Sequence, residues 1–142
     1  MPILDKNIKI LVVDDDPSAR LTVINILEEM EFENIFESFD GKDAYSKIKQ
    51  EQSSGDPFQI IFSDWQMPEM SGIELLKTIR EDESLKGLIV ILVTALNEKK
   101  FMLQAIELGV DSYITKPVDP KLIKERLKLA AQRRGLEVAV TV

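Results

Sequence analysis

The stretch "IIFSDWQMPEMSG", residues 60–72, decides the fold class of this 142-residue chain. It starts with an apolar run, as in a strand that is covered on both faces of a sheet, but the run ends on the carboxylate of Asp64. A Met-Pro turn follows, and Ser71-Gly72 can open a helix. Because an unpaired acid at the end of a buried strand is costly, Asp64 is a candidate functional residue.

The alternation of strand and helix repeats along the chain. Apolar, β-rich runs predict strands over residues 8–14, 34–39, 60–64, 87–95 and 112–116. Helical patterns follow them over residues 17–30, 40–50, 72–82, 98–108 and 119–134. Five strands alternating with five helices predict right-handed βαβ units, and therefore an α/β fold with a parallel sheet between two layers of helices.

Several helix boundaries are marked by residues that favour helix ends. Asp16 can cap the first helix with Pro17 at its first position, Asp40 can cap the second, and Gly109 can end the fourth. In the first helix, apolar residues recur at helical spacing: Leu21, Ile24 and Leu27. We expect one domain over residues 1–134, and a short tail or the start of a linker, "GLEVAVTV", over residues 135–142.

Composition excludes several kinds of chemistry. The chain has no cysteine and no histidine, which removes disulfides, thiol chemistry and histidine bases. A net charge of −7 argues against direct binding to nucleic acid. The longest purely apolar run, residues 88–93, is too short to insert into a membrane, and the N-terminus has no signal-peptide core. A cytoplasmic location is therefore expected.

Polar groups gather where the predicted strands end. The first strand ends in Asp14-Asp15, the third in Asp64 and the fourth in Thr94, while Lys116 follows the fifth. In an open α/β sheet, ligands bind beyond the carboxyl ends of the strands. These five side chains are therefore expected at one edge of the sheet.

Four motifs carry a resemblance to a known family. They are "ILVVDDDPSAR", "IIFSDWQMPEMSG", "ILVTA" and "YITKP". In order and approximate spacing they resemble the receiver domains of bacterial two-component response regulators (CheY-like), over roughly residues 7–132. The resemblance implies a flavodoxin-like, doubly wound (βα)5 fold with a five-stranded parallel sheet in the order 2-1-3-4-5. It also implies a phosphorylation-dependent signalling switch and not an enzyme with a separate substrate.

The clustered acids call for a cation. Three neighbouring carboxylates repel one another, and a hard divalent ion with oxygen ligands relieves that repulsion. Mg²⁺ suits such a site because it accepts few protein carboxylates and keeps waters and phosphate oxygens. The resemblance implies that Asp15, Asp64 and the main-chain carbonyl of Gln66 bind Mg²⁺ directly, and that Asp14 acts mainly through a bound water.

By the same resemblance, Asp64 is the phosphoacceptor, and the donor is a sensor histidine kinase or a histidine phosphotransfer protein. A carboxylate can attack a phosphoryl group, and Lys116 can neutralise charge on it. The Thr94 hydroxyl and the main-chain N–H of Ala95 are expected to donate to phosphoryl oxygens. Gln66 and Leu96 depart from the family pattern at positions that flank the phosphate, so the rate of dephosphorylation is left open.

Transmission of the signal is expected to involve Tyr113, which should point away from the side of Ser112 and Ile114. In receivers this aromatic residue often changes rotamer together with the residue equivalent to Thr94, although β propensity alone also accounts for a tyrosine in a strand. The family usually holds the bond equivalent to Lys116-Pro117 in the cis form. The output surface is expected on the fourth helix, fifth strand and fifth helix, where a downstream protein would dock.

Other interpretations compete with this one. A phosphatase of the haloacid-dehalogenase type needs a D-x-D-x-[TV] motif, which "DDDPS" does not supply. A flavodoxin-type flavin module needs a phosphate loop rich in hydroxyls and glycine after the first strand. Two further alternatives are a degenerate receiver that acts as an unphosphorylated interaction module, and a receiver cut from a longer regulator. We expect a stand-alone protein, because Met1 lies close to the first predicted strand.

Overall fold

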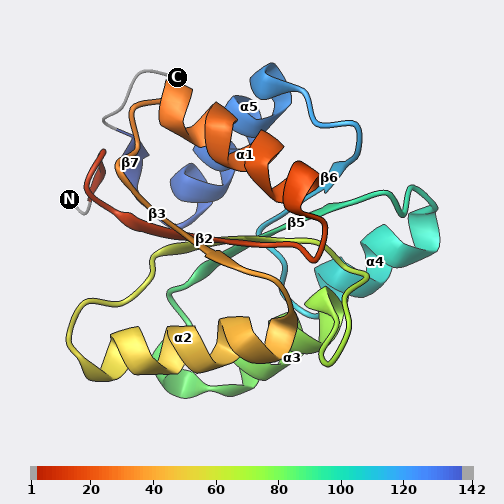
Figure 1. Ribbon diagram of the computed structural model, residues 1–142, viewed down its shortest axis with the longest axis horizontal. Helices are drawn as coiled ribbons and strands as arrows, with labels where there is room; N and C mark the ends of the chain where they lie inside the picture. Colours follow the sequence, from red (N-terminus) through yellow and green to blue (C-terminus); the bar gives the residue numbers. More distant parts are fainter. Residues whose placement is uncertain (1–2, 139–142) are drawn as a thin grey trace.

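The computed structural model describes residues 3–138 and has a central parallel sheet between two layers of helices (Figure 1). The sheet contains β2 (Lys9–Val13), β3 (Asn34–Ser38), β4 (Ile60–Ser63), β5 (Ile89–Thr94) and β6 (Ser112–Thr115). Their spatial order is β3-β2-β4-β5-β6. When only these five strands are numbered along the chain, the order is 2-1-3-4-5, so the predicted fold class is confirmed.

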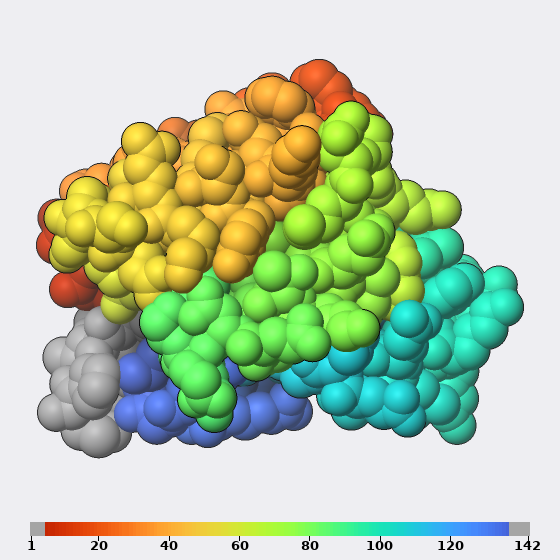
Figure 2. All heavy atoms as spheres, turned by 90° about the horizontal axis from the view of Figure 1, so that it is seen from below, coloured from red at the N-terminus to blue at the C-terminus, as the bar shows by residue number. Residues whose placement is uncertain are grey.

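Five α-helices connect the strands within the described residues. They are α1 (Pro17–Glu29), α2 (Gly41–Ser53), α3 (Gly72–Glu81), α4 (Lys99–Glu107) and α5 (Pro120–Arg133), and a short 3-10 turn, η1 (Glu83–Leu85), follows α3. Helices α1 and α5 cover one face of the sheet, and α2 and α3 cover the other (Figure 1). Figure 2 shows this second layer from outside, with α4 beside α3. Among residues 3–138, no helix is long and apolar enough to cross a membrane.

The local signals for the helix ends are confirmed. The Asp16 carboxylate accepts a hydrogen bond from the Ser18 N–H, and the Asp40 carboxylate accepts one from the Asp43 N–H, so both residues cap their helices. Gly109 lies just beyond α4 with φ +88°, in the left-handed region that glycine adopts without strain. Each of the five predicted strands was one residue too long at its end, because the observed strands stop at Val13, Ser38, Ser63, Thr94 and Thr115.

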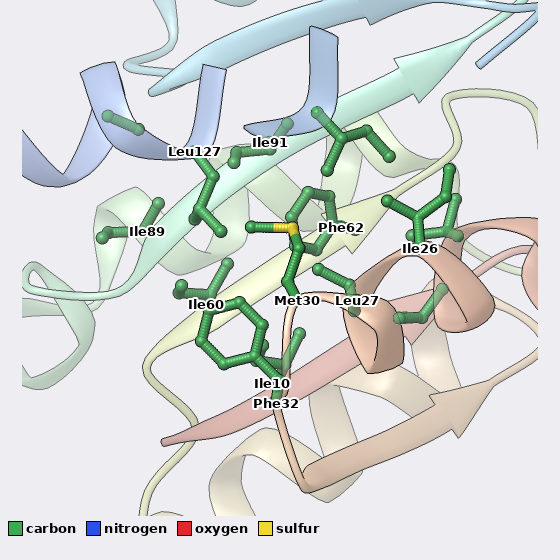
Figure 3. Close-up of a cluster of buried hydrophobic side chains, with 14 of the residues drawn as sticks. Ile10, Ile26, Leu27, Met30, Phe32, Ile60, Phe62, Ile89, Ile91 and Leu127 are labelled. Carbon is green, nitrogen blue, oxygen red and sulfur yellow. The ribbon is translucent and has the colours of Figure 1, made fainter. Parts of the chain in front are cut away.

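Two apolar cores lie on the two faces of the sheet. The core under α1 and α5 contains Ile10, Phe62 and Met30 (Figure 3), and the core under α2 and α3 contains Leu11 and Leu75. All five residues of β2 are buried, as are all six residues of β5. Neighbouring residues of a strand thus face opposite cores, which explains why the central strands are apolar without alternation.

The predicted apolar face of α1 was wrong in one position. Leu21 is exposed, Ile24 is partly buried and only Leu27 is fully buried. A step of three residues is shorter than one helical turn of 3.6 residues. Two such steps separate Leu21 from Leu27, so these two side chains lie on different sides of α1. The face that packs on the sheet consists of Val23, Ile26 and Leu27, followed by Met30.

The two ends of the described chain pair with each other, a contact that no pattern in the sequence predicts. Strand β1 (Ile3–Leu4) runs parallel to β7 (Glu137–Val138) and forms a separate two-stranded sheet with it. The expected tail over residues 135–142 therefore begins as a structured segment, and Leu136 packs against the core under α1 and α5. The last four residues of that tail lie outside the described part of the chain.

A partly buried ion cluster stabilises the sheet edge opposite the strands' carboxyl ends. The side chain of Asp111 is 9% exposed, and its Oδ2 accepts hydrogen bonds from Arg80 Nη2 at 2.7 Å and from the Val90 N–H at 2.8 Å. Its Oδ1 accepts one from Arg134 Nε at 2.8 Å. One carboxylate thus joins α3, β5 and the end of α5.

Candidate metal and phosphoryl site

Three carboxylates meet at the carboxyl ends of β2 and β4. The Asp14 N–H donates to the Ser38 carbonyl at 3.1 Å, and the Asp64 N–H donates to the Val13 carbonyl at 2.9 Å, so each backbone continues the sheet ladder for one residue beyond its strand. This brings Asp14, Asp15 and Asp64 together, with one carboxylate oxygen from each within 4.8 Å of the others. Asp14 and Asp64 are buried, and Asp15 is exposed. The predicted acid cluster therefore exists.

Lys116 bridges two of these acids. Its Nζ lies 3.0 Å from Asp14 Oδ2 and 3.3 Å from Asp64 Oδ2. Burial lowers the pKa of Lys116, but the hydrogen bond to Asp14 and the charges of Asp64 and Asp14 outweigh burial, so the pKa is raised overall and the side chain is a cation at neutral pH. The main-chain N–H of Lys116 donates to the Thr94 carbonyl at 2.8 Å, and the Lys116-Pro117 bond is cis, as expected.

The remaining carboxylate oxygens differ in how they are engaged. Asp64 Oδ1 accepts from the Trp65 N–H at 2.7 Å, and Asp14 Oδ1 accepts from the Asp16 N–H at 3.0 Å. Within the described residues, no group donates a hydrogen bond to the Asp15 carboxylate. Three acids with one exposed, unengaged carboxylate form a donor set that fits a hard divalent cation such as Mg²⁺.

Thr94 and Tyr113 are linked through one turn. Thr94 is fully buried, and its Oγ1 accepts from the Leu96 N–H at 3.2 Å, while the Tyr113 hydroxyl donates to the Leu96 carbonyl at 2.7 Å. Tyr113 and Ile114 face opposite cores, as predicted. Burial raises the pKa of the Tyr113 hydroxyl, and the charge of Asp64 adds to that effect, so it stays a donor at neutral pH. The backbone of Leu96 thus connects the Thr94 hydroxyl with the Tyr113 hydroxyl.

The two predicted main-chain contacts lie at exposed positions. Ala95 directly follows Thr94, and Gln66 follows Trp65 at the start of the turn that leads to α3. Both residues are exposed. Their assigned roles, contact with a phosphoryl oxygen for Ala95 and a carbonyl ligand for Gln66, stay predictions.

An aromatic cluster beside Asp64 was missed by sequence reasoning. The Trp65 ring makes edge-to-face contacts with Phe101, at a centroid distance of 5.4 Å, and with Tyr113, at 6.4 Å. Trp65 is buried, and Phe101 lies in the first turn of α4. The cluster thus connects the residue after Asp64 with both α4 and β6. An aromatic residue at the start of a helix was the only available signal, since the contact spans 36 residues of sequence.

Gly72 sets the distance between α3 and the Asp64 backbone. A Cβ atom at this position would lie 1.9 Å from the Asp64 carbonyl oxygen, and the Gly72 N–H donates to the Trp65 carbonyl at 2.8 Å. Gly72→Ala is therefore expected to destabilise the fold by about 3 kcal/mol in chemical denaturation, because backbone atoms must move apart. Gly87→Ala is the matched control, since nothing lies within 4 Å of its Cβ position. Equal stability of the two variants would contradict the close approach.

Comparison with known proteins decides the family. The family model described as "Response regulator receiver domain" matches residues 10–128. The chain belongs to this family. It therefore has a CheY-like receiver domain of two-component signalling, and receiver domains typically bind Mg²⁺ in an acidic pocket such as the one formed by Asp14, Asp15 and Asp64. Membership of the receiver family argues against the phosphatase and flavodoxin interpretations.

Individual relatives agree with this assignment. The receiver is 42% identical over 131 residues to "Chemotaxis protein CheY-3" of Vibrio cholerae, with 92% of this chain and 97% of the relative covered. It is 33% identical over 121 residues to "Chemotaxis protein CheY1" of Helicobacter pylori, with 85% and 94% covered. A chain in the structure of the CheX-CheY-BeF3-Mg²⁺ complex from Borrelia burgdorferi matches with a TM-score of 0.77 and 27% identity, over 85% of this receiver and 87% of that chain.

Proposed function

We propose that this receiver is a phosphorylation-dependent switch in which Asp64 accepts a phosphoryl group from a sensor histidine kinase or a histidine phosphotransfer protein. The observation that carries the proposal is the placement of the Asp64 carboxylate beside two further acids and within reach of the Lys116 ammonium group. A nucleophile, a cation and a set of oxygen ligands thus converge at one solvent-accessible edge of the sheet.

The transfer itself requires little covalent chemistry from the protein. A carboxylate oxygen of Asp64 forms a bond to phosphorus, the bond between phosphorus and the donor's imidazole nitrogen breaks, and the electron pair returns to that nitrogen, which then takes up a proton. Asp14, Asp15, Asp64 and the main-chain carbonyl of Gln66 would hold Mg²⁺, which supplies neutralisation of phosphoryl charge when bound. Lys116 adds a second positive charge, and Thr94 and the Ala95 N–H donate to phosphoryl oxygens.

The signal would leave the site through the turn after β5. If the Thr94 side chain rotates to donate to a phosphoryl oxygen, its Oγ1 moves relative to the Leu96 N–H from which it accepts, and Leu96 is also bonded to Tyr113. Tyr113 lines a groove on the α4–β6–α5 face together with Met102, Ile106 and Arg126. Met102 and Ile106 are exposed apolar side chains on this face. A downstream protein is therefore proposed to dock there in a manner that depends on phosphorylation.

The experiment that tests the proposed function uses acetyl phosphate as a small phosphodonor. The purified protein is incubated with acetyl phosphate and Mg²⁺ and its intact mass is measured, alongside a sample containing EDTA. One phosphoryl adduct that requires Mg²⁺ is the expected result. An absence of adduct at any Mg²⁺ concentration would favour the alternative, a receiver that serves as an unphosphorylated interaction module.

Replacement of Lys116 separates two effects of its charge. In Lys116→Met, the rate of adduct formation is expected to fall roughly 100-fold, because a preorganised positive charge near the phosphoryl oxygens is lost. Mg²⁺ binding is expected to become tighter, because the ammonium group no longer competes for Asp14 Oδ2 and Asp64 Oδ2. Stopped-flow fluorescence and calorimetry measure the two quantities, and a parallel loss of both would contradict the assigned role.

A further inference from the structure

Arg20 in the first turn of α1 holds the backbone between two acids of the site. Its Nη1 donates to the Asp14 carbonyl oxygen at 2.7 Å, and its Nε donates to Glu37 Oε1 at 2.8 Å. The Arg20 side chain is only 17% exposed, whereas the Glu37 side chain is 54% exposed. The guanidinium group therefore connects β3 with the peptide group that joins Asp14 to Asp15.

Within residues 3–138, no backbone N–H of the sheet donates a hydrogen bond to the carbonyl of that peptide group. The Asp14 N–H donates to the Ser38 carbonyl, which continues the ladder between β2 and β3, but β2 ends at Val13. The Asp14 carbonyl oxygen accepts its hydrogen bond from Arg20 instead. Since this carbonyl belongs to the peptide plane that leads into Asp15, its orientation constrains the direction in which the exposed Asp15 side chain leaves the backbone.

We propose that Arg20 is a positioning residue for divalent-cation binding, and that Glu37 braces it from β3. The inference rests on the proposed function, because it assigns Asp14 and Asp15 to the cation site. Arg20 would not itself be a ligand of the cation, because its guanidinium group is positively charged and has donors only. It acts on the ligands, in the way that hydrogen-bonding partners outside a metal site orient the residues that bind the metal.

The sign of the effect distinguishes positioning from simple electrostatics. Arg20, Asp14 and Asp64 line the same small cavity, so the guanidinium charge lies near the acids. If charge alone mattered, removing Arg20 would make the site more negative and Mg²⁺ would bind more tightly. Positioning predicts the opposite, because Mg²⁺ requires near-ideal octahedral geometry and a misdirected Asp15 cannot supply it.

The test is a Mg²⁺ titration by calorimetry, with Trp65 fluorescence as a second readout. Arg20→Met is expected to weaken Mg²⁺ binding about 10-fold or more. Arg20→Lys keeps the charge but offers one donor nitrogen in place of the two, Nε and Nη1, that reach Glu37 and the Asp14 carbonyl, so its dissociation constant is expected to lie between those of the wild type and Arg20→Met. Circular dichroism establishes that each variant is folded.

Arg134 supplies a matched control at the opposite end of the sheet. It also pairs with one carboxylate, that of Asp111, and donates to one main-chain carbonyl, that of Lys86. Arg134→Met therefore removes the same kinds of contact and lowers stability, but is expected to leave Mg²⁺ affinity unchanged. An equal loss of Mg²⁺ affinity in Arg134→Met and Arg20→Met would overturn the proposal, because the effect would then follow stability.

A double-mutant cycle tests the bracing role of Glu37. Glu37→Gln is expected to weaken Mg²⁺ binding by a few-fold in the wild type and to have no further effect in Arg20→Met. Unchanged or tighter Mg²⁺ binding in Arg20→Met would overturn the positioning role while the proposed function stands. A wild-type protein that binds no Mg²⁺ in either readout would overturn both.

Discussion

Asp64→Asn is expected to abolish the phosphoryl adduct completely while the protein stays folded. Asparagine has the same shape, and its amide oxygen can still accept from the Trp65 N–H, but it lacks the carboxylate oxygen that must attack phosphorus. Stability should not fall, because one of three clustered negative charges is removed and Lys116 keeps its bond to Asp14. Intact mass after treatment with acetyl phosphate and Mg²⁺ measures the adduct, and chemical denaturation measures stability.

Asp16→Asn is the matched control for this variant. It removes one carboxylate from the run Asp14-Asp15-Asp16 beside the site, but Asp16 serves as the helix cap of α1, and asparagine caps helices about as well as aspartate. Adduct formation in Asp16→Asn should therefore approach that of the wild type. A comparable loss in both variants would mean that net negative charge, and not the identity of residue 64, controls phosphorylation.

Asp111→Ala is expected to cause the largest loss of folding stability, about 3–5 kcal/mol, because it leaves two partly buried guanidinium groups without their carboxylate partner. Arg80 and Arg134 both pair with this carboxylate, and the Val90 N–H also loses its acceptor. Urea denaturation followed by circular dichroism measures the change in the free energy of unfolding.

A surface pair provides the control for Asp111. Glu83 pairs with Lys86 across one turn, with both side chains more than half exposed, so Glu83→Ala is expected to change stability by less than about 0.5 kcal/mol. Under conditions where it is folded, Asp111→Ala should bind Mg²⁺ like the wild type, since Asp111 lies at the edge of the sheet away from the acids. A mild effect on stability would mean that water already solvates the cluster.

The fold could be predicted because its signals are local. A run such as residues 89–94 can be recognised from its own composition as a strand that is buried on both faces. A capping aspartate such as Asp16 acts on its own helix. Where the outcome depended on distant residues, sequence reasoning failed. The exposure of Leu21 depends on which side of α1 meets the sheet, and the pairing of β1 with β7 joins segments that lie at opposite ends of the chain.

The candidate site was predictable for a different reason. A parallel sheet brings the carboxyl ends of its strands to one edge, so Asp14, Asp64 and Lys116 could be placed together although 102 residues separate the first from the last. The surrounding contacts do not follow from topology. The Arg20 side chain could extend in several directions from α1, and only the packed structure directs it to the Asp14 carbonyl.

The most direct test of the central claim identifies the residue that carries the phosphoryl group. Borohydride reduces an aspartyl phosphate to homoserine, so the phosphorylated protein is reduced, digested and sequenced by peptide mass spectrometry. We predict homoserine at position 64 alone, dependent on both Mg²⁺ and acetyl phosphate. Homoserine at position 14 or 15, or at none of the three acids, would contradict the assignment of Asp64 as the phosphoacceptor.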